Sequence, residues 1–96
     1  MENTNNNIDW NRVQEVKSSI LYWNQARYSG RGSVLVQEAD NVLCGIEIKL
    51  GINVGCEAEL RDDFITAVIT SVRRYKSVSE KQAFCLAKFF VKNNIN

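Results

Sequence analysis

Two amphipathic segments separated by a short polar turn occupy the last third of the chain, and they constrain the fold more than any other feature. In the first segment, apolar residues recur at spacings of four and three, close to the helical period of about 3.6 residues. They are Leu60, Phe64, Val68, Val72 and Tyr75. Acidic residues lie near the start of the segment and basic residues lie at its end, which suits the two poles of a helix dipole. The pattern predicts a helix over residues 57–76.

The turn between the two segments carries two overlapping start signals for a second helix. Ser77 with Glu80, or Ser79 with Gln82, can form a capping box that satisfies the first free amides of a helix. Residues 79–92 then continue with helical periodicity. We therefore expect a second helix there, and an αα-hairpin from the pair.

The second helix has more apolar surface than one neighbouring helix can cover. Phe84, Phe89 and Val91 lie outside the arc that faces the first helix. Burial of such side chains is worth roughly 1.5 to 3 kcal/mol each. This excess predicts a homo-oligomer interface at the three residues.

The second helix opens with the pattern Ser-x-Lys-Gln at residues 79–82, and an apolar run precedes it. That run contains Phe64, Ile65, Val68 and Ile69. On these positions, residues 63–90 resemble a short C-terminal helical hairpin of small phage and mobile-element proteins. The resemblance implies a phage or mobile-element origin, and it implies no catalytic residues.

The first third of the chain predicts one further helix, over residues 9–28. Asp9 is a suitable N-cap, and a narrow apolar seam follows at helical spacing. The seam consists of Val13, Val16, Ile20 and Trp23. The Gly-x-Gly run that begins at Gly30 favours a turn at the end of this helix. Trp10 and Trp23 lie in or beside the seam, and we expect both to pack in the core.

The middle of the chain supports two interpretations. A helix over residues 33–50, with Ser33 as N-cap and Gly51 at its end, accounts for a helical apolar stripe. Residues 46–60, however, alternate apolar and polar side chains as strands do, and this predicts a three-stranded meander at 34–60.

The helical interpretation is preferred, because the run Glu-Ala-Asp-Asn at residues 38–41 suits a helix better than a strand. The expected fold is therefore all-α, a small bundle of about four helices that ends in the hairpin. An α+β fold with the meander remains the alternative.

Composition predicts one small domain over residues 1–96, with 45% hydrophobic content and a formal net charge of +1. The polar ends, residues 1–7 and 93–96, are expected to be disordered. No apolar stretch approaches the roughly 18 residues of a membrane span, and the N-terminus lacks the basic and apolar regions of a secretion signal. We therefore expect a cytoplasmic location, in the host cell if the protein is phage-encoded.

Catalytic chemistry has little support in the sequence. The absence of histidine excludes Ser-His-Asp and Cys-His catalysis and histidine-ligated zinc. Cys44, Cys56 and Cys85 lack metal-binding or disulfide spacing and are expected to be buried free thiols. We expect no enzymatic activity, no metal and no cofactor.

The charge distribution indicates a binding surface. Residues 69–96 contain six basic residues and one acidic residue, a net charge of +5. With the exposed arginines of the Gly-containing loop, the residues expected to bind a partner or nucleic acid are Arg27, Arg31, Arg73, Arg74, Tyr75, Lys76, Lys81, Lys88 and Lys92.

Two functions follow from this surface. The first is a small protein that inhibits or regulates another protein by binding it, for example a component of host defence. The alternative is a nucleic-acid-binding accessory protein that uses the basic hairpin. Protein binding is preferred, because a net charge of +1 is modest for a dedicated nucleic-acid binder.

Overall fold

The expected all-α fold is confirmed. The computed structural model describes residues 8–29, 33–52 and 57–95, and within these ranges the chain forms helices and no strand. The elements are α1 (Trp10–Leu21), the 3-10 turn η2 (Tyr22–Gln25), α2 (Ala26–Ser29), α3 (Val34–Leu50), α4 (Asp63–Tyr75) and α5 (Glu80–Lys92).

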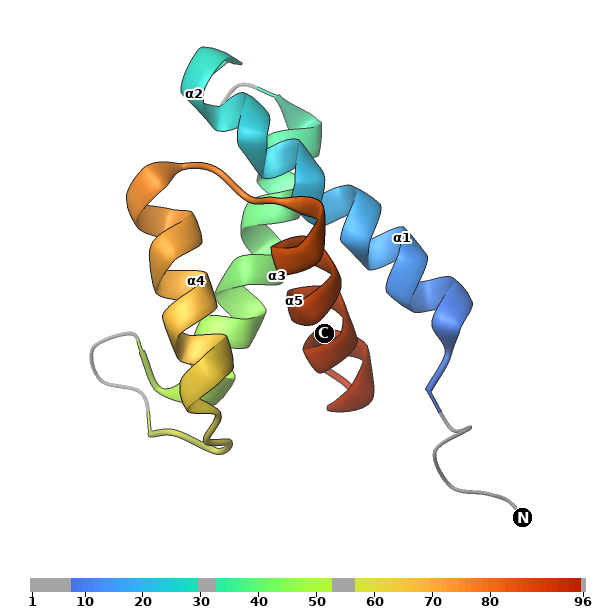
Figure 1. Cartoon of the computed structure of the whole chain (residues 1–96), viewed down its shortest axis with the longest axis vertical. Coiled ribbons are helices and arrows are strands. Elements are labelled where there is room, and N and C mark those ends of the chain that lie inside the picture. Colours follow the sequence, from blue (N-terminus) through green and yellow to red (C-terminus); the bar gives the residue numbers. More distant parts are fainter. Residues whose placement is uncertain (1–7, 30–32, 53–56, 96) are drawn as a thin grey trace.

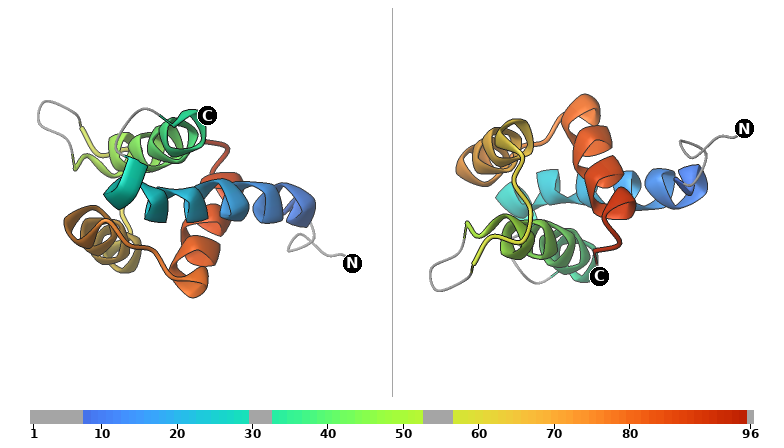
Figure 2. Two further views of the ribbon diagram at one scale, coloured as in Figure 1. Left: turned by 90° about the horizontal axis from the view of Figure 1, so that it is seen from above. Right: turned by 90° about the horizontal axis from the view of Figure 1, so that it is seen from below.

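The first three elements, α1, η2 and α2, form one bent segment that crosses the other helices and that we call the N-terminal arm (Figure 1). When the molecule is seen from above or from below, α3 lies on one side of this arm and α4 and α5 lie on the other (Figure 2). Helix α1 packs mainly against α5 and α3, whereas α4 contacts α5 and α3. Both helices of the α4–α5 hairpin therefore pack against the N-terminal half of the chain, α5 against α1 and α3 and α4 against α3.

The core receives residues from each of the four long helices. Among its fully buried side chains are Val13 and Ile20 of α1, Leu43 and Ile46 of α3, Ile69 and Val72 of α4, and Ala83 and Leu86 of α5. Each pair recurs at a spacing that places it on one face of its helix. The amphipathic periodicity of the sequence thus corresponds to a real buried face in every helix.

Side-chain caps begin the long helices. Asp9, Ser33, Asp62 and Ser79 each accept a hydrogen bond from the backbone amide three residues later. At α5, Ser79 and Gln82 form both bonds of a capping box, so this signal, and not the one at Ser77, starts the helix. The caps predicted at Asp9 and Ser33 are confirmed.

The helix predicted over residues 57–76 begins later than expected, at Asp63. Residues 57–62 form a connection in which the amides of Glu59 and Leu60 both donate to the carbonyl of Lys49, at 2.9 Å each. These amides are therefore unavailable for a helix. Asp62 caps α4 instead, with its carboxylate 2.9 Å from the Ile65 amide nitrogen.

The alternating stretch after residue 46 does not form a strand where the structure describes it. Residues up to Leu50 continue α3, and Gly51 ends the helix in a left-handed conformation with φ of 69°. The amides of Gly51 and Ile52 donate back to Ile48 and Glu47, which satisfies the last carbonyls of α3. Two apolar residues of the alternating pattern are exposed and line no strand face: Ile48 within α3 and Ile52 just after its end.

The C-terminal residues are more ordered than predicted. Ile95 is buried in the core, and its amide donates to the Phe90 carbonyl at 3.0 Å. Asn94 adopts φ of 53° and donates to Val91, which completes the same kind of helix end as at Gly51. The expectation of disorder is therefore wrong for residues 93–95. The other end predicted to be disordered, residues 1–7, lies outside the described residues, as does Asn96.

The two tryptophans differ. Trp23 is partly buried and packs against the core, as expected, whereas Trp10 is 47% exposed. Trp10 occupies the first position of α1, where its ring stacks on Phe84 of α5 instead of entering the core. Over the described residues, no helix has the length and apolarity needed to cross a membrane.

Candidate functional site

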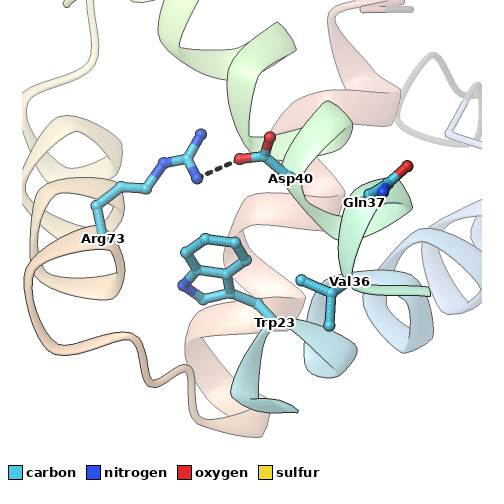
Figure 3. A pocket seen from close by; sticks show the side chains of 5 residues that line it. All are labelled: Trp23, Val36, Gln37, Asp40 and Arg73. Carbon is cyan, nitrogen blue, oxygen red and sulfur yellow. Dashed lines mark hydrogen bonds and ion pairs between the residues drawn. The ribbon is translucent and has the colours of Figure 1, made fainter. Parts of the chain in front are cut away.

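Arg73 of α4 lies in a cluster of polar side chains from α3. Its Nε and Nη2 donate to the two carboxylate oxygens of Glu47 at 3.0 and 2.9 Å, and its Nη1 donates to Asp40. Figure 3 shows Arg73 reaching across to Asp40, with the indole of Trp23 beside them. The Arg73 guanidinium carbon lies 5.0 Å from the ring centroid of Trp23, and Nη2 is 3.3 Å from the sulfur of Cys44.

Burial and pairing act in opposite directions on Arg73. Burial alone lowers the pKa of the guanidinium, but the hydrogen bonds that it donates to Glu47 and Asp40, with the negative charges of these carboxylates, outweigh burial, so the pKa is raised above its ordinary value. Glu47 is only 7% exposed. Arg73, predicted as a partner-binding residue, instead neutralises this carboxylate and joins α4 to α3.

A cavity of about 320 Å³ adjoins the cluster, lined by Trp23, Val36, Gln37, Asp40 and Arg73 (Figure 3). Its two charged walls, Asp40 and Arg73, are paired with each other. The sequence contains one signal for this arrangement: Asp40, Cys44 and Glu47 recur at spacings of four and three and so share a face of α3. Nothing in the sequence indicates which cation faces them.

The first candidate binding surface, which we call the tyrosine end, consists of Arg27, Tyr28, Arg74, Tyr75 and Lys76. It lies where α2 meets the end of α4 (Figure 1). Tyr28 is 84% exposed and Tyr75 is 60% exposed. Arg27 Nη2 lies 3.4 Å from the Tyr75 carbonyl oxygen, so residues far apart in the sequence meet here.

Hydrogen bonds from η2 hold the tyrosine end in place. The side chain of Asn24 donates to the Val78 carbonyl at 2.9 Å and accepts from the Val78 amide at 2.8 Å. Trp23 Nε1 donates to the Val72 carbonyl at 3.2 Å. The turn between α4 and α5 is thus fixed to the N-terminal arm before any partner arrives.

The remaining residues predicted for this surface are placed as follows. Arg31 lies outside the described residues, and Lys81 is exposed on the first turn of α5. The acidic residue beside it, Glu80, pairs with Lys17 at 3.5 Å. Tyr28, which was not predicted as a site residue, is the most exposed large hydrophobic side chain among those described, and its position directly after Arg27 was the available signal.

The second candidate surface, which we call the α5 groove, is a hollow of about 230 Å³ between α4 and α5. It is lined by Asp62, Phe64, Ile65, Cys85, Lys88, Phe89 and Lys92. Phe64, in the first turn of α4, is 62% exposed at its edge. Lys88 and Lys92, both predicted as binding residues, are exposed and lie one turn apart on α5.

Trp10 lies beside the α5 groove. Its ring stacks on Phe84 with centroids 6.3 Å apart and an interplanar angle of 6°. Lys88 Nζ lies 5.9 Å from the centroid of the Trp10 ring, and Lys88 also lines the groove. Lys88 therefore connects the exposed Trp10 ring to the groove that Phe64 also lines.

The predicted oligomer residues Phe84, Phe89 and Val91 are each partly buried and pack against the core of the subunit. Trp10 further covers Phe84. The apolar surface left for self-association at these three residues is therefore smaller than the sequence predicted, and a homo-oligomer remains a prediction.

Two of the three cysteines can be placed: Cys44 and Cys85 are partly buried free thiols, and Cys56 lies outside the described residues. Within the part of the chain that the structure describes, no group of three or more His, Cys, Asp and Glu side chains is arranged to hold a metal ion. The chemistry of the two surfaces is therefore that of cations and aromatic rings.

Comparisons with protein-family models, curated proteins and solved structures gave no match to this chain. The resemblance of residues 63–90 to the hairpins of phage and mobile-element proteins is thus neither supported nor contradicted. Inference about function has to begin with the two surfaces.

Proposed function

We propose that this chain is a non-enzymatic protein of phage or mobile-element type that binds another protein and inhibits or regulates it, for example a host defence component. The observation that supports the proposal is the exposed aromatic side chain of Phe64, which lines the α5 groove, together with the exposed ring of Trp10, which the groove residue Lys88 contacts. In protein interfaces, a few aromatic residues that fill pockets on the partner typically contribute much of the binding energy.

Phe64 has the properties of such an anchor. It lies two residues after Asp62, the N-cap of α4, and belongs to the first turn of this helix, so its backbone is fixed before binding. With 62% of its surface exposed, most of its apolar area is available to a partner. Full burial of a phenylalanine side chain contributes roughly 1.5 to 3 kcal/mol, and a rigid backbone lowers the entropic cost of ordering it.

The test is capture of proteins from a host lysate by the immobilised chain, with and without nuclease. Phe64→Ser removes the proposed anchor, and Tyr28→Ser is the matched control because it removes an exposed ring from α2, outside the α5 groove. We expect wild type and Tyr28→Ser to retain the same partner after nuclease treatment, and Phe64→Ser to lose it. Equal capture by all three proteins would place the contact elsewhere and overturn the assignment.

Inhibition or regulation is tested on the partner itself. Once captured, the partner's activity is measured at increasing ratios of the chain to the partner. We expect the activity to change in proportion to the bound fraction for wild type and to stay constant with Phe64→Ser. A partner that is bound without any change in activity contradicts the regulatory part of the proposal.

Nucleic-acid binding is the second candidate, and a different observation favours it. At the tyrosine end, Tyr28 and Tyr75 are exposed beside three cationic side chains, those of Arg27, Arg74 and Lys76. Exposed rings that stack on bases contribute about 1 to 3 kcal/mol per base in single-strand binders, and cations contact the phosphates. Retention of a labelled oligothymidylate at low ionic strength tests this candidate, and no retention eliminates it.

A further inference from the structure

We infer that the α5 groove binds a short acidic segment of the partner, which places one apolar side chain in the hollow and two carboxylates on Lys88 and Lys92. This inference rests on the proposed function, because it specifies the partner of the same surface. It follows from the charge, the shape and the spacing of the groove.

The two lysines determine the sign of the partner's charge. Lys88 and Lys92 are both exposed and both line the hollow. The acidic residue of the lining, Asp62, already accepts the Ile65 amide as the N-cap of α4. The α5 side of the groove therefore attracts anionic groups, whereas the carboxylate on its α4 side is already engaged as a helix cap.

The spacing of the lysines matches carboxylates on a folded segment. Four residues along an α-helix correspond to a rise of about 6 Å, so the backbone positions from which Lys88 and Lys92 extend are separated by about that distance along α5. Glutamates or aspartates four residues apart on a partner helix have the same separation. An amphipathic helix with acidic residues beside an apolar stripe satisfies both the lysines and the hollow.

The apolar part of the groove favours a peptide over a nucleic acid. Phe64, Ile65 and Phe89 form walls that only an apolar side chain can fill with favourable contacts. A phosphate backbone leaves this hollow unfilled. Lys88 also lies over the Trp10 ring, where it occupies a face on which a base would stack.

Fluorescence anisotropy with designed probes tests the inference. The first probe is a labelled amphipathic peptide of glutamate, leucine and phenylalanine at helical spacing. In the second probe every glutamate is replaced by glutamine, and in the third the leucine and phenylalanine are replaced by alanine. We expect only the first probe to bind, with an affinity on the order of micromolar that weakens as salt rises.

Variants locate the contact. Because reversal of two rim charges replaces attraction with repulsion, Lys88→Glu with Lys92→Glu is expected to weaken binding about 10-fold. Lys81→Glu is the matched control, an exposed lysine at the other end of α5, and should change affinity less than about 2-fold. Phe64→Ala should abolish the advantage of the first probe over the third. Circular dichroism and thermal melting confirm that each variant is folded.

The outcomes separate this inference from the proposed function. If the glutamine probe binds as well as the first probe, the acidic partner is wrong, although the groove still binds protein. If no peptide binds but lysate capture still requires Phe64, the acidic segment is likewise overturned and the proposed function stands. If neither peptide binding nor capture depends on Phe64, both fail. Competition by oligothymidylate at the groove contradicts the choice of peptide over nucleic acid.

Discussion

The tyrosine end and the α5 groove both combine exposed aromatic rings with cations, but they differ in what holds them. At the tyrosine end, Asn24 bonds to the backbone of the turn between α4 and α5, and Trp23 and Arg27 donate to backbone carbonyls in the last turns of α4. At the α5 groove, the rings lie over apolar packing between α1, α4 and α5, and a hollow remains. The same kinds of side chain therefore form a polar, hydrogen-bonded platform at one end and an apolar recess at the other.

This difference decides what each surface suits. A platform with exposed rings and cations can accept a flat base and its phosphate, whereas a recess with rings at its edge accepts an apolar side chain. Charge alone does not separate the two surfaces, because each carries at least two cations. Substitutions of the residues that hold the helices and turns beneath the two surfaces are expected to change stability most, and substitutions of the exposed charges are expected to change it least.

The largest effect is expected from Arg73→Met, which leaves the Glu47 carboxylate buried without its partner. Breaking a buried pair costs roughly 3 to 5 kcal/mol, and the partial exposure of Arg73 and Asp40 reduces our expectation to about 2 to 4 kcal/mol. Urea unfolding measures it. The control is Arg74→Met, at an exposed neighbouring position, which should change stability by less than about 0.5 kcal/mol. Equal effects of the two substitutions would place Arg73 on the surface with Arg74.

Gly51→Ala tests how the start of α4, and with it Phe64, is positioned. Gly51 has φ of 69°, and a Cβ atom there would lie 2.7 to 2.8 Å from atoms of Ala58. The left-handed conformation costs an alanine about 1 to 2 kcal/mol, and the overlap adds to it, so we expect a loss of about 2 to 3 kcal/mol. Thermal or urea unfolding provides the measurement.

Asparagine at the same position separates the two causes. Gly51→Asn tolerates the left-handed conformation better than alanine does but introduces the same Cβ atom. If the approach of Ala58 dominates, asparagine is as destabilising as alanine. If asparagine restores the stability of glycine, the backbone conformation is the cause and the connection does not hold α4 through close packing.

Asn24→Ala is expected to have an intermediate effect, because it removes both hydrogen bonds to Val78. Loss of partly buried hydrogen bonds costs about 1 to 2 kcal/mol. Hydrogen exchange of the Val78 amide should accelerate more than exchange in α5, since the turn loses its attachment to η2. Asn11→Ala, at an exposed position of α1, serves as the control. Unchanged exchange at Val78 would mean that the tyrosine end does not depend on this attachment.

The features predicted correctly from the sequence are the local ones. Asp9, Ser33 and Ser79 cap their helices through bonds to amides three residues away, so the signal and the structure occupy the same short segment. The start of α4 was placed too early, because Leu60 fits the helical spacing while its amide donates to Lys49, outside the segment. Tertiary contacts override periodicity in such cases.

The candidate site was less predictable for the same reason. The partners of Arg73 are 26 and 33 residues away in the sequence. No local pattern therefore indicates that Arg73 is paired with carboxylates instead of belonging to the exposed basic surface. Phe64 belongs to the apolar stripe read from the sequence, yet it is exposed, because the buried face of α4 is centred on Ile65, Ile69 and Val72. The lysines at positions 88 and 92 were identified as binding residues, but the recess next to them requires the packing of two helices.

The smallest effect on stability, and the most direct test of the comparison, is expected from the exposed charges. Arg74→Gln and Lys76→Gln change the tyrosine end, and Lys88→Gln and Lys92→Gln change the α5 groove. All four side chains are exposed, so each variant should differ from wild type by less than about 0.5 kcal/mol in unfolding free energy. Any difference in binding therefore reports contact with the ligand.

If the tyrosine end contacts phosphates, loss of Arg74 or Lys76 should lower the slope of log affinity against log salt by about 0.7 per contact for a single strand. The groove variants should leave this slope unchanged while they weaken the acidic peptide. Absence of salt-dependent retention of oligothymidylate by wild type would leave the tyrosine end as a solvated face or a second protein contact. Reduction of the slope by the groove variants alone would reverse the assignment, since it would show that the recess and not the hydrogen-bonded platform follows the nucleic-acid backbone.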